Sequence, residues 1–290
     1  MKRLLLCILL LSSHFLFVQG LDAAEIQPNL QDLVSRLQKD GIDLQYLTSV
    51  FTRPELELVP HAVAKGLVRK EARLNYGQFL ENYAVAKATS YLHTHQAALK
   101  TAEERFGISG PVIVAILCVE TACGSYLGGY TALNLLATQA TSLQPDMFQT
   151  IYELIPSEER TGLSKQAAEK RLKKKARRAY RELKALLNYA REHRIDPFSI
   201  LGSAEGAIGI PQFLPSNIPV YGRDGDGDGK IDLFHHEDAI ASVASFLKSF
   251  RWKEDASYQG KKKVILRYNR SRYYADTVLT LAEKLQKSWH

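Results

Sequence analysis

The stretch from Val112 to Val119 constrains the fold of this chain more than any other feature, because its eight residues are apolar without interruption. A helix with no polar stripe has to be surrounded by other elements, so the stretch predicts a helix buried in the core. Ser109-Gly110-Pro111 precedes it and is typical of a helix start, since proline near the first helical position loses no hydrogen bond. The helix is predicted to end within Glu120–Gly124, with Gly124 as the stop.

Glu120 directly follows this apolar stretch. Burial of an isolated charge is costly, and both apolar surroundings and a helix C-terminus raise the pKa of a carboxyl group. A raised pKa is what a general acid needs to keep its proton near neutral pH. The alternative interpretation is an ordinary helix-end residue that faces solvent.

The rest of the chain indicates a mainly α protein. Apolar residues recur with helical spacing over Leu30–Leu37, Tyr76–Leu99, Ala239–Phe250 and Tyr274–Leu285. There is no internal repeat and no convincing strand alternation, so helices are expected to pack on helices. The chain has 290 residues, 46% of them hydrophobic, which is enough for one or two globular domains.

The N-terminus has the layout of a secretory signal peptide. Lys2 and Arg3 precede the apolar stretch Leu4–Leu11, and small residues follow before position 25. A membrane anchor is the alternative, but a spanning helix needs about 20 apolar residues. Cys7 lies too early to become a lipid-attachment site. We therefore expect residues 1–24 to direct export and to be removed, which leaves a soluble periplasmic product.

Two cysteines remain after the signal peptide, Cys118 and Cys123. An oxidising compartment permits a bridge between them. On one continuous helix they would lie on different faces, too far apart for a disulfide, so a bridge requires the helix to end between them. The sequence leaves both outcomes open.

The formal net charge of +7 favours a polyanionic partner or surface. Many of the cations crowd residues 158–194. One interpretation of this basic segment is a solvated helix face, and the other is attachment to anionic wall polymer or lipid headgroups. No nucleic-acid motif accompanies it, so no nucleic-acid partner is expected. The cations are Lys165, Lys170, Arg171, Lys173, Lys174, Lys175, Arg177, Arg178 and Arg181.

A glycine-rich segment extends from Gly202 to Ser216. Its glycines allow close backbone approach and unusual dihedrals, as the floor of a groove requires. Ser203 and Gln212 are neutral hydrogen-bonding groups suited to sugar hydroxyls and amides. The alternative is a loop that uses its glycines only for turns.

An acidic loop begins at Asp224 and has the spacing of an EF-hand calcium loop. Oxygen ligands are expected at positions 1, 3, 5, 7 and 9, with glycine at position 6, and such hard oxygen ligands suit Ca²⁺. His235 departs from the pattern at position 12, where glutamate is usual. The alternative is a solvated Asp/Gly turn. The candidate ligands are Asp224, Asp226, Asp228, the carbonyl of Lys230, and Asp232, with Gly229 at the turn.

Together these motifs resemble the membrane-bound lytic transglycosylase B family of the lysozyme-like superfamily. The similarity extends from about Gly107 to the C-terminus and is weaker around Phe51–Pro60. The ordered combination is far more specific than any one motif. The matching stretches are Ala115–Thr121 with Gly124, Leu135–Thr138, Gly202–Ser216, Asp238–Ile240 with Ser242–Ala244, and Arg267-Tyr268-Asn269.

The resemblance implies a lysozyme-like catalytic domain over residues 101–290, preceded by an N-terminal helical region over residues 25–100, and we expect a monomer. It also implies that Glu120 is the only acid/base, whereas ordinary glycosidases use two carboxylates. Glu120 would protonate the oxygen between N-acetylmuramic acid and N-acetylglucosamine in peptidoglycan. It would then take a proton from the C6 hydroxyl, which closes onto C1 as a 1,6-anhydro end. No organic cofactor is implied.

The remaining site residues are also carried over from the family. Ser203, Gln212 and Asn269 would form hydrogen bonds around the substrate, and Tyr268 and Tyr221 would stack on or position the sugars.

For the acidic loop, the resemblance offers Asp238 as the closing calcium ligand, with Glu237 as the alternative. The ion would have a structural role, holding the loop beside the groove.

The chain also departs from the family. No β-rich insert is expected between Trp252 and Arg267, and the family's Asn-Tyr-Pro-Arg-Arg stretch, associated with stem-peptide contacts, is missing after Thr138. Glu205 replaces a small uncharged residue and is either a second carboxylate at the groove or a solvent-facing substitution. A second carboxylate would favour a hydrolytic, lysozyme-type enzyme. A third possibility is a wall-binding protein without catalysis.

Overall fold

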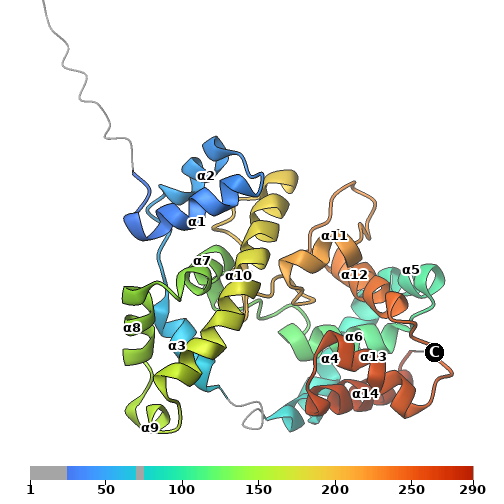
Figure 1. Ribbon diagram of the computed structural model, residues 1–290. Coiled ribbons are helices and arrows are strands. Elements are labelled where there is room, and N and C mark those ends of the chain that lie inside the picture. Colours follow the sequence, from blue (N-terminus) through green and yellow to red (C-terminus); the bar gives the residue numbers. More distant parts are fainter. Residues whose placement is uncertain (1–24, 70–74, 290) are drawn as a thin grey trace, which may run out of the picture.

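The computed structural model describes residues 25–69 and 75–289 and is built almost wholly from helices (Figure 1). The predicted mainly α class is confirmed, whereas the predicted signal peptide lies outside the described residues. Within the described part, no helix combines the length and apolar character needed to cross a membrane. The helices are α1 (Pro28–Lys39), α2 (Leu44–Phe51), α3 (Pro60–Val68), the 3₁₀ turn η2 (Tyr76–Leu80), α4 (Asn82–Thr94), α5 (Gln96–Phe106), α6 (Gly110–Thr121), α7 (Ala132–Thr141), α8 (Pro145–Glu153), α9 (Ser157–Arg160), α10 (Lys165–His193), the 3₁₀ turn η3 (Pro215–Asn217), α11 (Ile218–Tyr221), α12 (His236–Ser249), α13 (Tyr258–Tyr268) and α14 (Arg272–Gln286).

Helix α6 is the central element of one half of the molecule. It begins after Ser109, as predicted, and every residue from Gly110 to Val119 is buried. It packs against α4, α5, α12 and α14, and Figure 1 shows it within this group of helices. The prediction of a helix surrounded by the core is therefore confirmed.

The end of α6 differs from the prediction. The helix ends at Thr121, and the left-handed conformation begins at Ala122 (φ 49°) and continues through Cys123 (φ 61°) and Gly124 (φ 84°). The predicted end within Glu120–Gly124 is confirmed, but Gly124 is not the stop, because the chain has already reversed at Ala122. This reversal brings the Cα atoms of Cys118 and Cys123 to 4.0 Å, and the two residues form a disulfide. The helix thus ends between the cysteines, the condition that a bridge requires.

The helical spacing over Tyr76–Leu99 does not form one helix. Extended backbone at Glu81 separates η2 from α4, and His95 separates α4 from α5. The ring of His95 packs against those of Tyr91 and His236, with centroids 4.3 and 4.4 Å away. Apolar spacing indicates which side of a segment is buried. It does not reveal a break between two successive helices that bury the same side.

Helix α10 organises the other half of the molecule. It packs along α7 and also contacts α3 and α8, and it includes most of the basic segment predicted at residues 158–194 (Figure 1). Ser164 caps it by accepting a hydrogen bond from the amide of Ala167. The boundary at residue 100 between the N-terminal helical region and the lysozyme-like domain stays a prediction.

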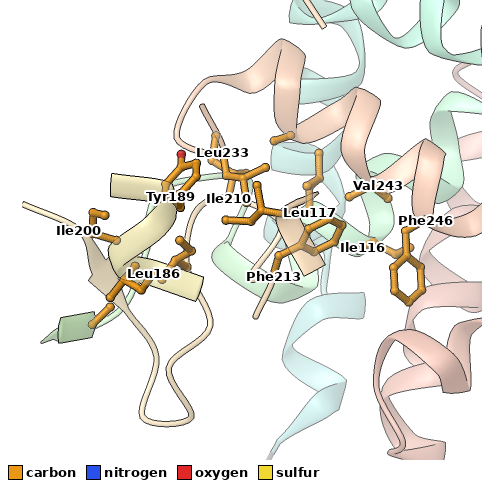
Figure 2. Packing of buried hydrophobic residues seen from close by; sticks show 14 of the residues in the cluster. Ile116, Leu117, Leu186, Tyr189, Ile200, Ile210, Phe213, Leu233, Val243 and Phe246 are labelled. Atoms are coloured by element: carbon orange, nitrogen blue, oxygen red, sulfur yellow. The ribbon is translucent and has the colours of Figure 1, made fainter. Parts of the chain in front are cut away.

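A short ribbon and the glycine-rich segment lie between the two groups of helices. Strand β1 (Tyr130–Thr131) pairs antiparallel with β2 (Leu201–Gly202), with Tyr130 opposite Gly202. Figure 2 shows Ile210 and Phe213 of the glycine-rich segment packed beside Leu117 of α6. The same buried cluster continues to Leu186 and Tyr189 of α10, so the segment is part of a core shared by both groups.

Candidate active site

Glu120 lies in the last turn of α6 and is partly buried between the buried residues Val119 and Thr121. Burial disfavours the ionised form and raises the pKa of Glu120 to about 7, although the nearby hydroxyl of Tyr274 lowers it in part. The predicted upward shift is confirmed. A carboxyl group with this pKa exists in both protonation states near neutral pH, as a group that first donates and then accepts a proton requires.

Two tyrosines interact electrostatically with Glu120. Their rings, from Tyr268 at the end of α13 and Tyr274 in α14, are parallel with centroids 6.5 Å apart. Burial and the charge of Glu120 raise the pKa of both phenols well above the usual value, so both hydroxyls keep their protons. The buried Tyr274 hydroxyl completes no hydrogen bond of normal geometry with any described residue. It is therefore a proton donor held close to the carboxyl group.

Tyr268 was predicted from the sequence, whereas Tyr274 was missed because the spacing of its segment indicated only an amphipathic helix. The two tyrosines belong to different helices, and it is the turn at Asn269 that brings them to the same carboxyl group. Spacing along one helix carries no signal for this arrangement.

The segment Ile208–Phe213 is hydrogen-bonded to the end of α6. The hydroxyl of Thr121 donates to the carbonyl of Ile210 at 2.9 Å, and the amide of Ile210 donates to the carbonyl of Leu233 at 2.8 Å. Gly209 has a φ of 73°, and a Cβ atom there would lie 2.6 Å from the Leu233 oxygen. Only glycine fits this position without moving the backbone.

Gln212 and Tyr268 meet this segment from its other side. The hydroxyl of Tyr268 donates to the carbonyl of Pro211. Gln212 adopts a φ of 50°, and its side-chain amide donates to the carbonyls of Gly209 at 2.9 Å and Leu127 at 3.1 Å. Both of its N–H groups are thus used, and within the described residues no donor reaches its side-chain oxygen. That oxygen is the part of Gln212 that a ligand can engage.

Ser203 organises the turn after β2. Its hydroxyl oxygen accepts from the amides of Ala207 at 3.2 Å and Glu205 at 3.4 Å.

Glu205 points from this turn to α10, where it forms ion pairs with Lys175, at 2.5 Å, and with Arg178. Burial raises the pKa of Glu205, but the two cations more than offset this and lower it overall. Glu205 is therefore ionised and neutralised by α10. These partners were visible in the sequence only as members of the basic run.

Asn269 and Tyr221 contact their own surroundings. The side-chain oxygen of Asn269 accepts from the amide of Ser271 at the start of α14 at 3.1 Å. The ring of Tyr221 packs edge-on against Phe246, with centroids 4.8 Å apart, in a cluster of aromatic rings. Among the contacts of the described residues, Tyr268 is the predicted substrate residue that interacts with Glu120, and Gln212 lies in the loop fastened beside it.

The acidic loop gathers three of its predicted ligands. Carboxylate oxygens of Asp224, Asp226 and Asp238 lie within 4.8 Å of one another. Asp228 and Asp232 lie outside this cluster. Each accepts a hydrogen bond from the backbone amide two residues further along the chain. Lys230 is exposed and donates its amide to Asp228.

Asp238 is the buried member of the cluster. It accepts from the amides of Gly225 at 2.7 Å and Asp232 at 2.6 Å. Burial raises its pKa, and the charges of Asp226 and Asp224 add to the rise. The alternative ligand Glu237 lies 3.5 Å from His235. Three converging carboxylates, one of them buried, fit a hard divalent cation that would supply the missing positive charge.

Comparison with known proteins identifies the family. Residues 25–262 match the family described as the transglycosylase SLT domain, which is more than half of the chain. The chain belongs to this family. Membrane-bound lytic murein transglycosylase B of Escherichia coli (strain K12) is 27% identical to this SLT-domain chain over 256 residues, which cover 84% of the chain and 63% of that relative. The chain thus spans less than two thirds of that relative's length.

The SLT domain also resembles solved structures in fold. Escherichia coli Slt35 in complex with calcium superposes with a TM-score of 0.71 at 22% identity, covering 90% of this chain and 93% of that one. Pseudomonas aeruginosa SltB1 gives a TM-score of 0.71 at 23% identity, covering 90% and 99%. Pseudomonas aeruginosa SltB3 in complex with NAG-NAM-pentapeptide gives 0.68 at 20% identity, covering 89% and 79%.

The raised pKa of Glu120 predicts a pH-dependent stability. The unfolded chain loses this proton near pH 4.5, whereas the folded protein keeps it to about pH 7. The free energy of unfolding therefore falls between these pH values and stays lower above them. Glu120→Gln should remove this loss, making the variant more stable than the parent by about 2–3 kcal/mol at pH 8, with little difference at pH 4. Urea denaturation measures it. The exposed Glu104→Gln serves as control, and a constant difference across pH would contradict the assignment.

Proposed function

We propose that this protein is a lytic transglycosylase that cleaves the bond between N-acetylmuramic acid and N-acetylglucosamine in peptidoglycan. The observation that carries the proposal is the single carboxyl group at the end of α6, with a pKa of about 7 and two protonated tyrosines beside it. Its relatives support the substrate class: one is named a lytic murein transglycosylase, and SltB3 binds NAG-NAM-pentapeptide.

In the first step, protonated Glu120 donates its proton to the glycosidic oxygen. The bond from this oxygen to C1 of N-acetylmuramic acid breaks, and N-acetylglucosamine leaves with a free C4 hydroxyl. The acetamido oxygen of the substrate supports the positive charge that develops at C1. In the second step, ionised Glu120 takes the proton of the C6 hydroxyl while the oxygen of that hydroxyl bonds to C1. This closes the 1,6-anhydro ring and restores the acid.

The neighbouring residues prepare Glu120 and hold the sugar. The Tyr274 hydroxyl, which faces Glu120, donates to the carboxylate after the first step and stabilises it. Tyr268 keeps the Ile208–Phe213 segment in place, and the side-chain oxygen of Gln212 accepts from the substrate. Ser203 and Asn269 are proposed as further hydrogen-bonding groups. Tyr221 is proposed to support the groove through its aromatic cluster rather than to stack on sugar.

Ca²⁺ is the proposed structural ion of the acidic loop, held by Asp224, Asp226 and Asp238, with Asp228, Asp232 and the carbonyl of Lys230 completing the set. When bound, it neutralises the converging carboxylates and fixes the loop. The amide of Ile210 donates to the carbonyl of Leu233 at the end of this loop. An ordered loop therefore helps to hold the Ile208–Phe213 segment in place. No organic cofactor enters the reaction. We also propose export to the periplasm, where the polymer lies.

A hydrolytic, lysozyme-type reaction is the second candidate. It needs a second carboxylate that activates water or attacks the sugar across the scissile bond. Glu205 is the candidate offered by the sequence, but its two ion pairs direct it to Lys175 and Arg178 of α10. A carboxylate with a lowered pKa that is held by two cations is a poor base. The arrangement favours a single-acid mechanism.

Glu120→Gln keeps the side-chain shape but removes the transferable proton. Because general acid/base catalysis contributes about 10²–10⁴-fold, turnover of purified sacculi should fall by at least this factor. Mass spectrometry should find 1,6-anhydro ends in digests by the parent and few soluble products from the variant. Near-normal turnover by the variant would show that Glu120 is not the catalytic acid.

Calcium should stabilise the folded protein. A ligand that binds only the native state adds about 2.7 kcal/mol at a hundredfold excess over Kd, which appears as a higher melting temperature. Asp228→Ala and Asp238→Asn should each weaken this response to Ca²⁺. Melting in calcium and in chelator provides the measurement. If neither Ca²⁺ nor chelator changes the melting temperature of the parent protein, and calorimetry detects no binding of Ca²⁺, the site does not exist.

Glu205→Gln tests the hydrolytic alternative. We expect 1,6-anhydro ends from the variant as from the parent, because Glu205 neutralises α10 and takes no part in the chemistry. The matched control is Glu169→Gln, an exposed glutamate of α10. Reducing ends made by the parent and lost in the Glu205 variant, but not in the control, would identify a hydrolase.

A further inference from the structure

One face of α10 carries cations that form no ion pair with any residue in the described part of the chain. Their spacing of three or four residues places them along one side of the helix, and all are exposed. Within the described residues none of them forms an ion pair or hydrogen bond through its side chain. By contrast, Lys184 of the same helix pairs with Asp40 at 3.4 Å. We call this set the cationic stripe: Lys170, Lys173, Lys174, Arg177 and Arg181.

The middle of the stripe borders a cavity of about 290 Å³ between α1, α7 and α10. Arg177 lies at this cavity together with Arg36 of α1, whose guanidinium lies 4.3 Å over the ring of Tyr180. Asp32 also lines it and reaches Arg36 at 3.8 Å, so the two guanidinium groups outnumber the single carboxylate. Apolar side chains, including Leu33, complete the lining.

This chemistry fits a carboxylate attached to a small apolar group. Guanidinium groups bind carboxylates through paired hydrogen bonds, and an apolar lining accepts an aliphatic side chain. The C-terminal residue of a linear peptide has both parts. The stripe is about 16 Å long at 1.5 Å per helical residue, close to the roughly 17 Å of an extended five-residue peptide.

A lipid surface fits less well. Helices that lie on membranes present large apolar side chains beside their cations. No large apolar side chain of α10 is exposed in the described structure. Like charges three and four residues apart also repel one another, so a bound polyanion relieves a cost that the free helix bears.

The stripe is separate from the two cations of α10 that neutralise Glu205. Lys175 and Arg178 occupy the neighbouring side of the same helix and hold Glu205, in the turn organised by Ser203.

We propose that the cationic stripe and the adjoining cavity form a second, non-catalytic binding face for the carboxylate-bearing peptides of peptidoglycan. This inference rests on the proposed function, because it takes peptidoglycan as the substrate. Peptides on strands beside the one being cleaved occupy the stripe and retain the enzyme on an insoluble polymer. Binding is electrostatic and weakens with salt.

The test compares two triple variants in a Glu120→Gln background, which prevents digestion of the polymer. One carries Lys173→Gln, Lys174→Gln and Arg177→Gln. The matched control, Lys100→Gln with Lys253→Gln and Lys263→Gln, removes the same charge at exposed positions outside the stripe. For purified sacculi at low salt, the half-saturating concentration should rise about tenfold in the stripe variant and less than twofold in the control. The difference should vanish on sacculi whose peptides have been removed by an amidase.

Other outcomes overturn the inference. Equal binding of both variants to sacculi would contradict it, and so would a difference that survives peptide removal. A difference seen with phosphatidylglycerol vesicles but absent with sacculi would assign the stripe to a lipid surface. With Glu120 restored, the stripe variant should cleave peptide-free glycan at the parental rate. The two proposals fail separately: a parent without 1,6-anhydro products contradicts the proposed function, and equal binding of the variants contradicts the peptide-binding face.

Discussion

The backbone of Ile210 connects the parts of this molecule that its chemistry needs. Its carbonyl accepts from Thr121, next to Glu120, and its amide donates to Leu233, at the end of the acidic loop. Both partners are buried, so neither hydrogen bond is exchanged readily for one to water. The end of α6 that carries Glu120 and the end of the acidic loop are therefore hydrogen-bonded to the same residue. Gly209 makes this possible, because any larger residue would collide with Leu233.

Burial and charge shift the pKa values of Glu120 and Glu205 in different ways. Burial raises the pKa of Glu120 to about 7, whereas two cations keep Glu205 ionised. The first shift lowers the free energy of unfolding at and above neutral pH. The pKa values of the two carboxyl groups thus shift in opposite directions because of what surrounds each of them.

Parts of this arrangement could be predicted from the sequence because they are local. An uninterrupted apolar stretch must be buried, so α6 and Glu120 were found, and the spacing of the acidic loop found Asp224 and Asp226, although Asp228 and Asp232 lie outside the cluster. The role of Tyr274 and the partners of Glu205 were missed because they arise between helices distant in sequence. The break at His95 was missed because α4 and α5 bury the same side, and the stop of α6 before Gly124 because Ala122 adopts a conformation that alanine rarely takes.

The disulfide at the end of α6 gives the site a dependence on maturation. Glu120 lies inside the small covalent ring that Cys118 and Cys123 close. In a reducing compartment the two thiols stay apart, and the left-handed turn after Glu120 is held by hydrogen bonds alone. Oxidation locks the turn that ends the helix beside the carboxyl group. The reduced and the oxidised chain thus share one sequence but differ in how firmly the turn after Glu120 is held.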